Sequence, residues 1–182
     1  MGPSLAELLH EWHDFYVLVG TASGTLVGLM FVAVSIGTAI FNEDRSAGVT
    51  AFITPTVMHF AAVLFACLLA TIPTHTWGTL GGLLGAGALA GSISSGKLVV
   101  QMIIRHRFNV DLSDRLFYAL LPLLGYLLAL TAAWLLLMQS TISVNLLAAG
   151  VLTLLVAAIR NAWDMMVWIV IKTPSGAAPP PS

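Results

Sequence analysis

The sequence predicts an all-α, polytopic membrane protein with five transmembrane helices, preceded by an amphipathic helix at the membrane interface. The 182-residue chain is 8% charged and 58% hydrophobic, whereas a soluble domain is about a quarter charged. Its mean hydropathy is +0.95. Several apolar runs reach the roughly 20 residues that a helix needs to cross about 30 Å of hydrocarbon. We therefore expect the lipid bilayer to surround most of the chain. A net charge of -1 offers no basic patch, so no nucleic-acid partner is expected.

The first element expected is an amphipathic helix over residues 4–14. Ser4 is a suitable N-cap, and the leucine and aromatic side chains that follow share one helical face while the acidic ones share the other. No Lys or Arg precedes the first apolar run, and no small-residue cleavage site follows it. We expect an interfacial helix that is retained in the mature protein and not a cleaved signal peptide.

Three spans are expected in the first half of the membrane domain, which covers residues 15–171. They are 15–41, 50–72 and 76–100. The second contains a proline, which a membrane helix tolerates because neighbours can satisfy the freed backbone groups. The third is rich in Gly and Ala, and its one charge lies at its far end.

Two further spans are expected at 115–138 and 142–171, and a disordered Pro/Gly/Ser/Ala tail at 173–182. As one helix, the last span would be about 45 Å long, which exceeds the bilayer core. Polar residues from 160 to 164 interrupt it. We therefore expect this span to end near residue 159 and an interfacial turn to follow, although a tilted continuous helix is the alternative.

The basic residues predict the topology, because Lys and Arg concentrate in cytoplasmic loops. With five spans, all of them fall on one side of the membrane. We therefore expect the N-terminus outside and the C-terminus in the cytoplasm. The residues that carry this prediction are Arg45, Lys97, Arg105, Arg107, Arg115, Arg160 and Lys172.

Small residues at four-residue spacing mark candidate helix-packing faces, because they let helix backbones approach closely in lipid. Packing within one bundle is the more common role of such faces, and self-association or a pore lining is the alternative. Two such flanks on the third span make a homo-oligomer or a larger membrane complex a reasonable expectation. The glycines concerned are Gly20, Gly24, Gly28, Gly78, Gly82, Gly87 and Gly91.

His59 is the one ionisable residue well inside a predicted span. Such a group is by default a functional hypothesis, as a proton relay, an ion-pathway residue or an axial ligand of a haem or chlorophyll-type pigment. The simpler interpretation is a neutral histidine with one interhelical hydrogen bond. No second histidine lies in a facing span, so the cofactor, if any, is left unknown.

Three histidines, His10, His13 and His75, should meet near the outer face, with carboxylates nearby. Imidazoles of this kind can bind Zn or Cu. A solvated interfacial face is the more common explanation, because the helical spacing of the first two points their rings only partly together.

Four polar residues are expected at the opposite rim. Arg160 and Asp164 are spaced to pair on one helical face beside Asn161, and Lys97 can extend to the same rim. A rim ion pair is more often structural than functional, but a continuous last helix would move this group into the bundle.

The first fifth of the chain carries a resemblance. Trp12-His13-Asp14-Phe15, followed by Leu26-Val27-Gly28-Leu29-Met30-Phe31-Val32-Ala33-Val34-Ser35, resembles the opening of a group of small uncharacterised bacterial inner-membrane proteins. The resemblance implies a bacterial cytoplasmic membrane. It implies no activity and no functional residue.

These patterns favour a non-enzymatic role, because no catalytic triad, paired-carboxylate site or phosphate-binding loop is found. The first hypothesis is a structural or accessory subunit of a membrane assembly. The alternative is a small homo-oligomeric channel or transporter, although polar residues for a lining are scarce. A weaker alternative is a pigment- or haem-binding subunit that uses His59.

Overall fold

The computed structural model describes the backbone of residues 3–40, 43–104 and 116–172, and the side chains of residues 3–35, 54–101 and 118–167. The predicted tail at 173–182 and the cationic residues 105, 107 and 115 lie outside the described residues.

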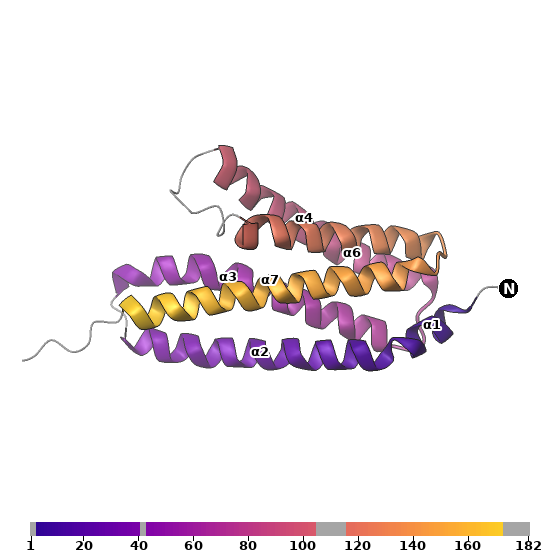
Figure 1. Cartoon of the computed structure of the whole chain (residues 1–182), viewed down its shortest axis with the longest axis horizontal. Coiled ribbons are helices and arrows are strands. Elements are labelled where there is room, and N and C mark those ends of the chain that lie inside the picture. Colours follow the sequence, from indigo (N-terminus) through magenta and orange to yellow (C-terminus); the bar gives the residue numbers. More distant parts are fainter. Residues whose placement is uncertain (1–2, 41–42, 105–115, 173–182) are drawn as a thin grey trace, which may run out of the picture.

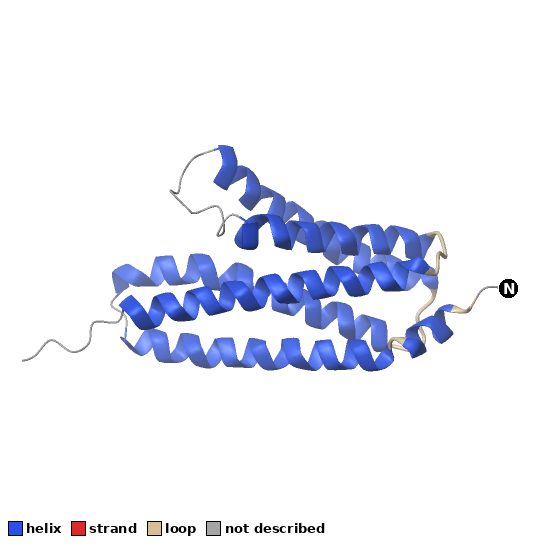
Figure 2. Ribbon diagram, in the orientation of Figure 1, coloured by secondary structure: helices blue, strands red, loops and turns tan. Residues whose placement is uncertain are grey.

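The described residues form helices and no strand, as Figure 2 shows. Five helices are long and apolar enough to cross a membrane, which confirms the predicted fold class. The helices are α1 (Leu5–Glu11), α2 (His13–Ile40), α3 (Glu43–Thr71), α4 (Trp77–Ile104), the π-helical turn η1 (Leu116–Leu120), α6 (Leu121–Leu137) and α7 (Ile142–Lys172).

Helix α1 is short, and a capping box begins it. The Ser4 hydroxyl accepts a hydrogen bond from the Glu7 backbone N–H, and the Glu7 carboxylate accepts one from the Ser4 backbone N–H at 2.7 Å. Both bonds satisfy N–H groups that have no partner inside the helix. An aromatic corner of Trp12, Phe15 and Tyr16 joins α1 to α2, with edge-to-face contacts at 5.2 and 5.3 Å between ring centroids. Aromatic side chains of this kind are favoured at membrane interfaces.

The expected break in the last span is wrong, because α7 continues without interruption from Ile142 to Lys172. Arg160 and Asp164 form an ion pair at 2.6 Å across one helical turn. Each side chain therefore has its countercharge on the same helix. Asn161, between them, is buried. The Arg160–Asp164 pair is satisfied on the helix and gives the backbone no reason to leave it.

The order in which the helices pack side by side differs from their order in the chain. Helix α7 lies in the middle, packed against α6 and α3. Helix α2 packs on α3, and α4 packs on α6. Helices α3 and α4 are consecutive in sequence but make little contact with each other. Figure 1 shows that α4 diverges from α3 toward the end of the bundle at which α2, α4 and α7 finish.

The turn between α6 and α7 has a Schellman arrangement. The Gln139 N–H donates to the carbonyl of Leu136 and the Ser140 N–H to that of Leu135, both at 2.9 Å. Gln139 has a φ of 56°, in the left-handed region that usually holds glycine at this position. The turn brings α7 back alongside α6.

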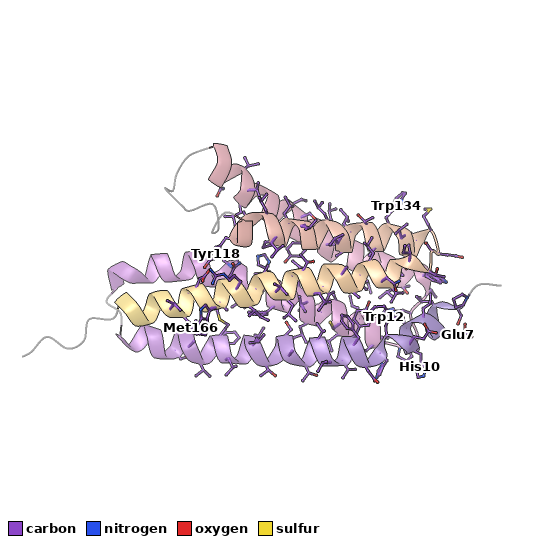
Figure 3. All side chains as sticks on the ribbon, viewed as in Figure 1. Glu7, His10, Trp12, Tyr118, Trp134 and Met166 are labelled. Atoms are coloured by element: carbon purple, nitrogen blue, oxygen red, sulfur yellow. The ribbon has the colours of Figure 1, made fainter. Side chains whose placement is uncertain are left out.

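Large apolar side chains cover the outside of the bundle. Figure 3 shows Trp134 pointing away from it, and this side chain is 62% exposed. In water such a surface would drive aggregation, whereas lipid solvates it. Exposed side chains of this kind include Leu18, Phe31, Phe65, Leu83, Ile93, Trp134, Ile142 and Trp163.

Candidate ligand-binding groove

A groove of about 960 Å³ lies between α3 and α4. It forms because these two helices contact each other little, while α6 and α7 close its floor. Residues of α3 from 54 to 69 form one wall, and residues of α4 from 83 to 101 form the other. The α4 wall is about 27 Å long at 1.5 Å per residue, which is close to the thickness of the hydrocarbon core. The groove therefore extends over most of the bilayer's depth.

His59 lies on the α3 wall and is held by Tyr126 of the floor. Its Nδ1 lies 3.0 Å from the Tyr126 hydroxyl. The Tyr126 ring fits against α4 at Gly91, where any Cβ would clash with three ring atoms. Three helices thus fix the orientation of the imidazole, as a histidine that must present its other nitrogen to a ligand requires.

Two polar groups of the groove lack a partner within the protein. His59 and Ser95 both line the groove and are 5% and 4% exposed. Nε2 of His59 and the Ser95 hydroxyl have no hydrogen-bond partner among the described residues. A buried polar atom without a partner costs about 1–3 kcal/mol. Their presence in the same groove indicates that a ligand supplies what the protein does not.

The groove is polar at one end and apolar at the other. Thr54, Lys97 and Gln101 line the end where α4 diverges from α3, and His59 and Ser95 lie next to this end. The remaining length is lined by Ala, Leu, Phe and Gly side chains, including Ala62, Phe65, Ala66, Leu69, Leu83, Leu84, Gly87 and Ala88. No acidic side chain lines the described groove. This gradient of polarity matches the change from the headgroup region to the hydrocarbon interior on one side of a bilayer.

Sequence reasoning identified His59 but missed Tyr126 and Ser95. Tyr126 is the one tyrosine in the middle of its span, and a buried tyrosine hydroxyl usually has a partner. The mid-span position of Tyr126 could therefore have identified it from the sequence. What the sequence does not contain is the register between α3 and α6, which decides whether the two side chains meet.

The predicted packing glycines divide into two groups. A Cβ at Gly20 would lie 3.0 Å from the Cβ of Cys67, one at Gly24 would lie 3.8 Å from Leu64, and Gly91 holds the Tyr126 ring. In contrast, a Cβ at four others would meet nothing within 4 Å: Gly28, Gly78, Gly82 and Gly87. A packing role for these four requires a neighbour outside the described chain and stays a prediction.

Three other glycines also make close contacts between helices. A Cβ at Gly125 would lie 2.7 Å from Leu154, and one at Gly150 would lie 3.0 Å from the Gly125 carbonyl. A Cβ at Gly81 would lie 3.0 Å from the backbone carbonyl oxygen of Ala133. The α6–α7 and α4–α6 contacts thus depend on glycines that the spacing pattern did not single out.

The three histidines predicted near the outer face are not gathered into a metal site. Among the described residues, no group of three or more His, Cys, Asp or Glu side chains is placed to hold a metal ion. His10 and His13 are exposed. His75 lies in the turn before α4, with its Nδ1 3.3 Å from the Thr79 hydroxyl of that helix.

The polar residues predicted at the rim belong to two different places. Lys97 is exposed and lines the groove. Arg160 and Asp164 pair on α7, outside the groove lining. The Tyr118 hydroxyl donates to the Asn161 backbone carbonyl at 3.3 Å, and Figure 3 shows Tyr118 beside α7. This contact ties η1 to α7, which is a structural role.

Comparisons of this chain with protein families, with curated proteins and with solved structures found no match.

Proposed function

We propose that this protein is a non-enzymatic accessory subunit of a membrane assembly, and that it binds an amphiphilic molecule from the bilayer in the groove between α3 and α4. The observation that carries the proposal is the pair of buried, unpartnered polar groups at His59 and Ser95 in an otherwise apolar groove. Binding sites for small molecules are mostly apolar with a few placed polar groups, and this groove has that composition.

The lining favours holding a ligand over transforming or conducting one. The described lining holds one hydroxyl–imidazole pair, Tyr126 with His59, and no carboxylate to orient the imidazole as in a catalytic triad. An ion pathway needs a continuous polar lining. Here more than half of the groove's length is lined by apolar side chains.

A bulky substitution that fills the groove tests the proposal. Nothing lies within 4 Å of a Cβ at either Gly87 or Gly82, but only Gly87 lines the groove. We expect wild-type protein purified in mild detergent to retain a small-molecule mass in native mass spectrometry. Gly87→Phe should lose that mass, and the matched control Gly82→Phe should keep it. Equal retention in both variants would show that the molecule binds elsewhere.

A second candidate function has one specific observation in its favour. Tyr126 occupies Nδ1 of His59 and leaves Nε2 without a protein partner, as in the axial histidine of a haem or pigment. Protein purified from its native membrane would then show a Soret or near-infrared band, and His59→Ala would abolish it. A colourless wild-type protein removes this candidate.

Two sequence-based expectations extend the proposal to the assembly. The resemblance at the N-terminus and the one-sided basic residues support a bacterial inner membrane with the N-terminus outside. The open flank of α4 at Gly78 and Gly82 leaves room for association with a second copy or a larger complex. Chemical crosslinking in the native membrane measures both the partner and the stoichiometry.

A further inference from the structure

The arrangement of polar and apolar side chains along the groove indicates which class of molecule binds there. We infer that the groove binds one phospholipid with an anionic headgroup, placed with its head at Lys97 and its ester carbonyls at His59 and Ser95. This inference rests on the proposed function, because it names the molecule that the groove takes up.

The hydrogen-bonding groups of His59 and Ser95 require acceptors from the ligand, and carbonyl oxygens meet this requirement. No second partner for the Tyr126 hydroxyl lies among the described residues. A hydroxyl with a single partner satisfies its proton by donating it, so we assign the donor role to Tyr126 and the acceptor role to Nδ1 of His59. The neutral ring then carries its own proton on Nε2. The groove therefore presents an N–H donor at His59 and an O–H donor at Ser95. The two ester carbonyls of a phospholipid are acceptors only, and they match this pair.

The charge and the depth of the polar end fit an anionic head. Ser95, Lys97 and Gln101 follow one another along α4, so Lys97 lies about 3 Å and Gln101 about 9 Å beyond Ser95 along the helix axis. The exposed Lys97 side chain lines the same groove, on the side of the two donors that is farther from the bilayer centre. With no acidic side chain in the described lining, this charge is available to a phosphate. A cation near the membrane surface attracts anionic lipid by about 1 kcal/mol.

The occupant is better matched by acyl chains than by a helix of another protein. A helix with its side chains is about 10–12 Å wide, and its backbone carbonyls are already hydrogen-bonded within the helix. Its carbonyls, each already bonded once, are therefore weaker acceptors for the donors of His59 and Ser95 than the free ester carbonyls of a lipid. Acyl chains can instead follow the apolar length of the groove from Ala62 to Leu69 on α3, while the carbonyls remain at the polar end.

The headgroup is tested with the full chain and defined lipids. Phosphatidylglycerol and phosphatidylcholine with identical acyl chains are titrated separately into delipidated protein, and bound lipid is counted by native mass spectrometry. We expect wild-type protein to prefer phosphatidylglycerol about fivefold, the equivalent of about 1 kcal/mol. Lys97→Gln should bring the two affinities to parity. Arg160→Gln removes the same charge outside the groove and should keep the preference.

The carbonyl contacts are tested with a diether phosphatidylglycerol, which lacks both carbonyls. Wild-type protein should bind the ester-linked lipid about three- to tenfold more tightly, and Ser95→Ala should reduce this ratio. Equal binding of ester and ether lipids overturns the placement of the carbonyls, and an unchanged preference in Lys97→Gln overturns the headgroup assignment. Both failures leave the proposed function intact if Gly87→Phe still removes the lipid. If Gly87→Phe binds normally, the proposed function itself fails.

Discussion

A histidine in the middle of an apolar helix is tolerated here because its neighbours are arranged around it. Tyr126 supplies the hydrogen bond to Nδ1 of His59, and Gly91 supplies the space for the Tyr126 ring. The hydrogen bond is the interhelical contact that a neutral buried histidine requires. The remaining nitrogen has no partner in the protein, and that nitrogen gives the residue its functional interest.

The packing of the Tyr126 ring against α4 predicts that alanine substitutions at two glycines of α4 change the stability differently. Gly91→Ala should lower the free energy of unfolding by about 1–3 kcal/mol, because the added methyl displaces a buried ring. Gly87→Ala should be neutral or stabilising by up to about 1 kcal/mol, because nothing lies within 4 Å of the new Cβ and alanine is the better helix former. Unfolding by sodium dodecyl sulphate in mixed micelles measures both. Equal effects would show that the ring does not rest on Gly91.

The positive φ of Gln139 makes a second prediction. Gln139→Gly should stabilise the protein by roughly 0.5–1 kcal/mol, because the left-handed conformation is unfavourable for a residue with a side chain. Met138, next to it, has a φ of -83°, so Met138→Gly gains no such relief and should destabilise the helix end. The same micelle titration compares the two variants. A loss of stability in Gln139→Gly would contradict the assigned turn geometry.

At the residue scale, what the sequence could predict was the type of group and not its partner. His59 stands out because ionisable side chains are costly in lipid, so one sequence is enough to single it out. The contacts of Tyr126, Gly125 and Gly150 depend on how two helices are shifted along each other. A span that is apolar on all sides shows no local sequence pattern from which this shift could be predicted.

At the scale of the element, helix length followed directly from the bilayer. Span bounds predicted from hydropathy agree with α2, α4 and α7 to within a few residues, because about 20 apolar residues must be helical in lipid. The break expected near residue 159 was wrong because Arg160 and Asp164 satisfy each other across one turn. A polar cluster ends a helix only when its groups cannot be satisfied on the helix itself.

The capping box of α1 makes a prediction about pH. The Ser4 backbone N–H and, to a lesser extent, the Ser4 hydroxyl hold the pKa of Glu7 below its ordinary value of 4.5. A depressed folded-state pKa contributes helix stability above the ordinary value, and this contribution is lost as the pH falls through the folded-state pKa. Glutamine also completes a capping box.

We therefore expect α1 in the wild-type protein to lose helicity below pH 4.5, while Glu7→Gln keeps the same helicity across this range. Carbon-13 chemical shifts of Leu8 and Leu9 in detergent micelles report the helicity of α1 directly. Identical pH profiles for the two proteins would exclude a role for the Glu7 carboxylate in the cap.

At the scale of the whole molecule, the order of neighbours was not predictable. Helices consecutive in sequence usually pack together, yet α3 and α4 make little contact, and α7 separates the α2–α3 pair from the α4–α6 pair. The groove, and with it the proposed function, results from this arrangement. Hydropathy determines how many helices cross the bilayer, whereas side-chain fit determines which of them become neighbours.

The claim on which the rest depends is that the apolar helices cross the bilayer, and α3 and α7 test it because a labelled residue can be placed at both ends of each. Single cysteines at residues 43, 74, 139 and 172, introduced into a Cys67→Ala background, are labelled with a membrane-impermeant maleimide in right-side-out vesicles. Thr74 and Gln139 follow α3 and α6, and Glu43 and Lys172 lie at the opposite helix ends. Labelling at 74 and 139 in intact vesicles, and at 43 and 172 only after permeabilisation, is the predicted result. Labelling of residues 43 and 74 from the same face would contradict it, because α3 would then not cross the membrane.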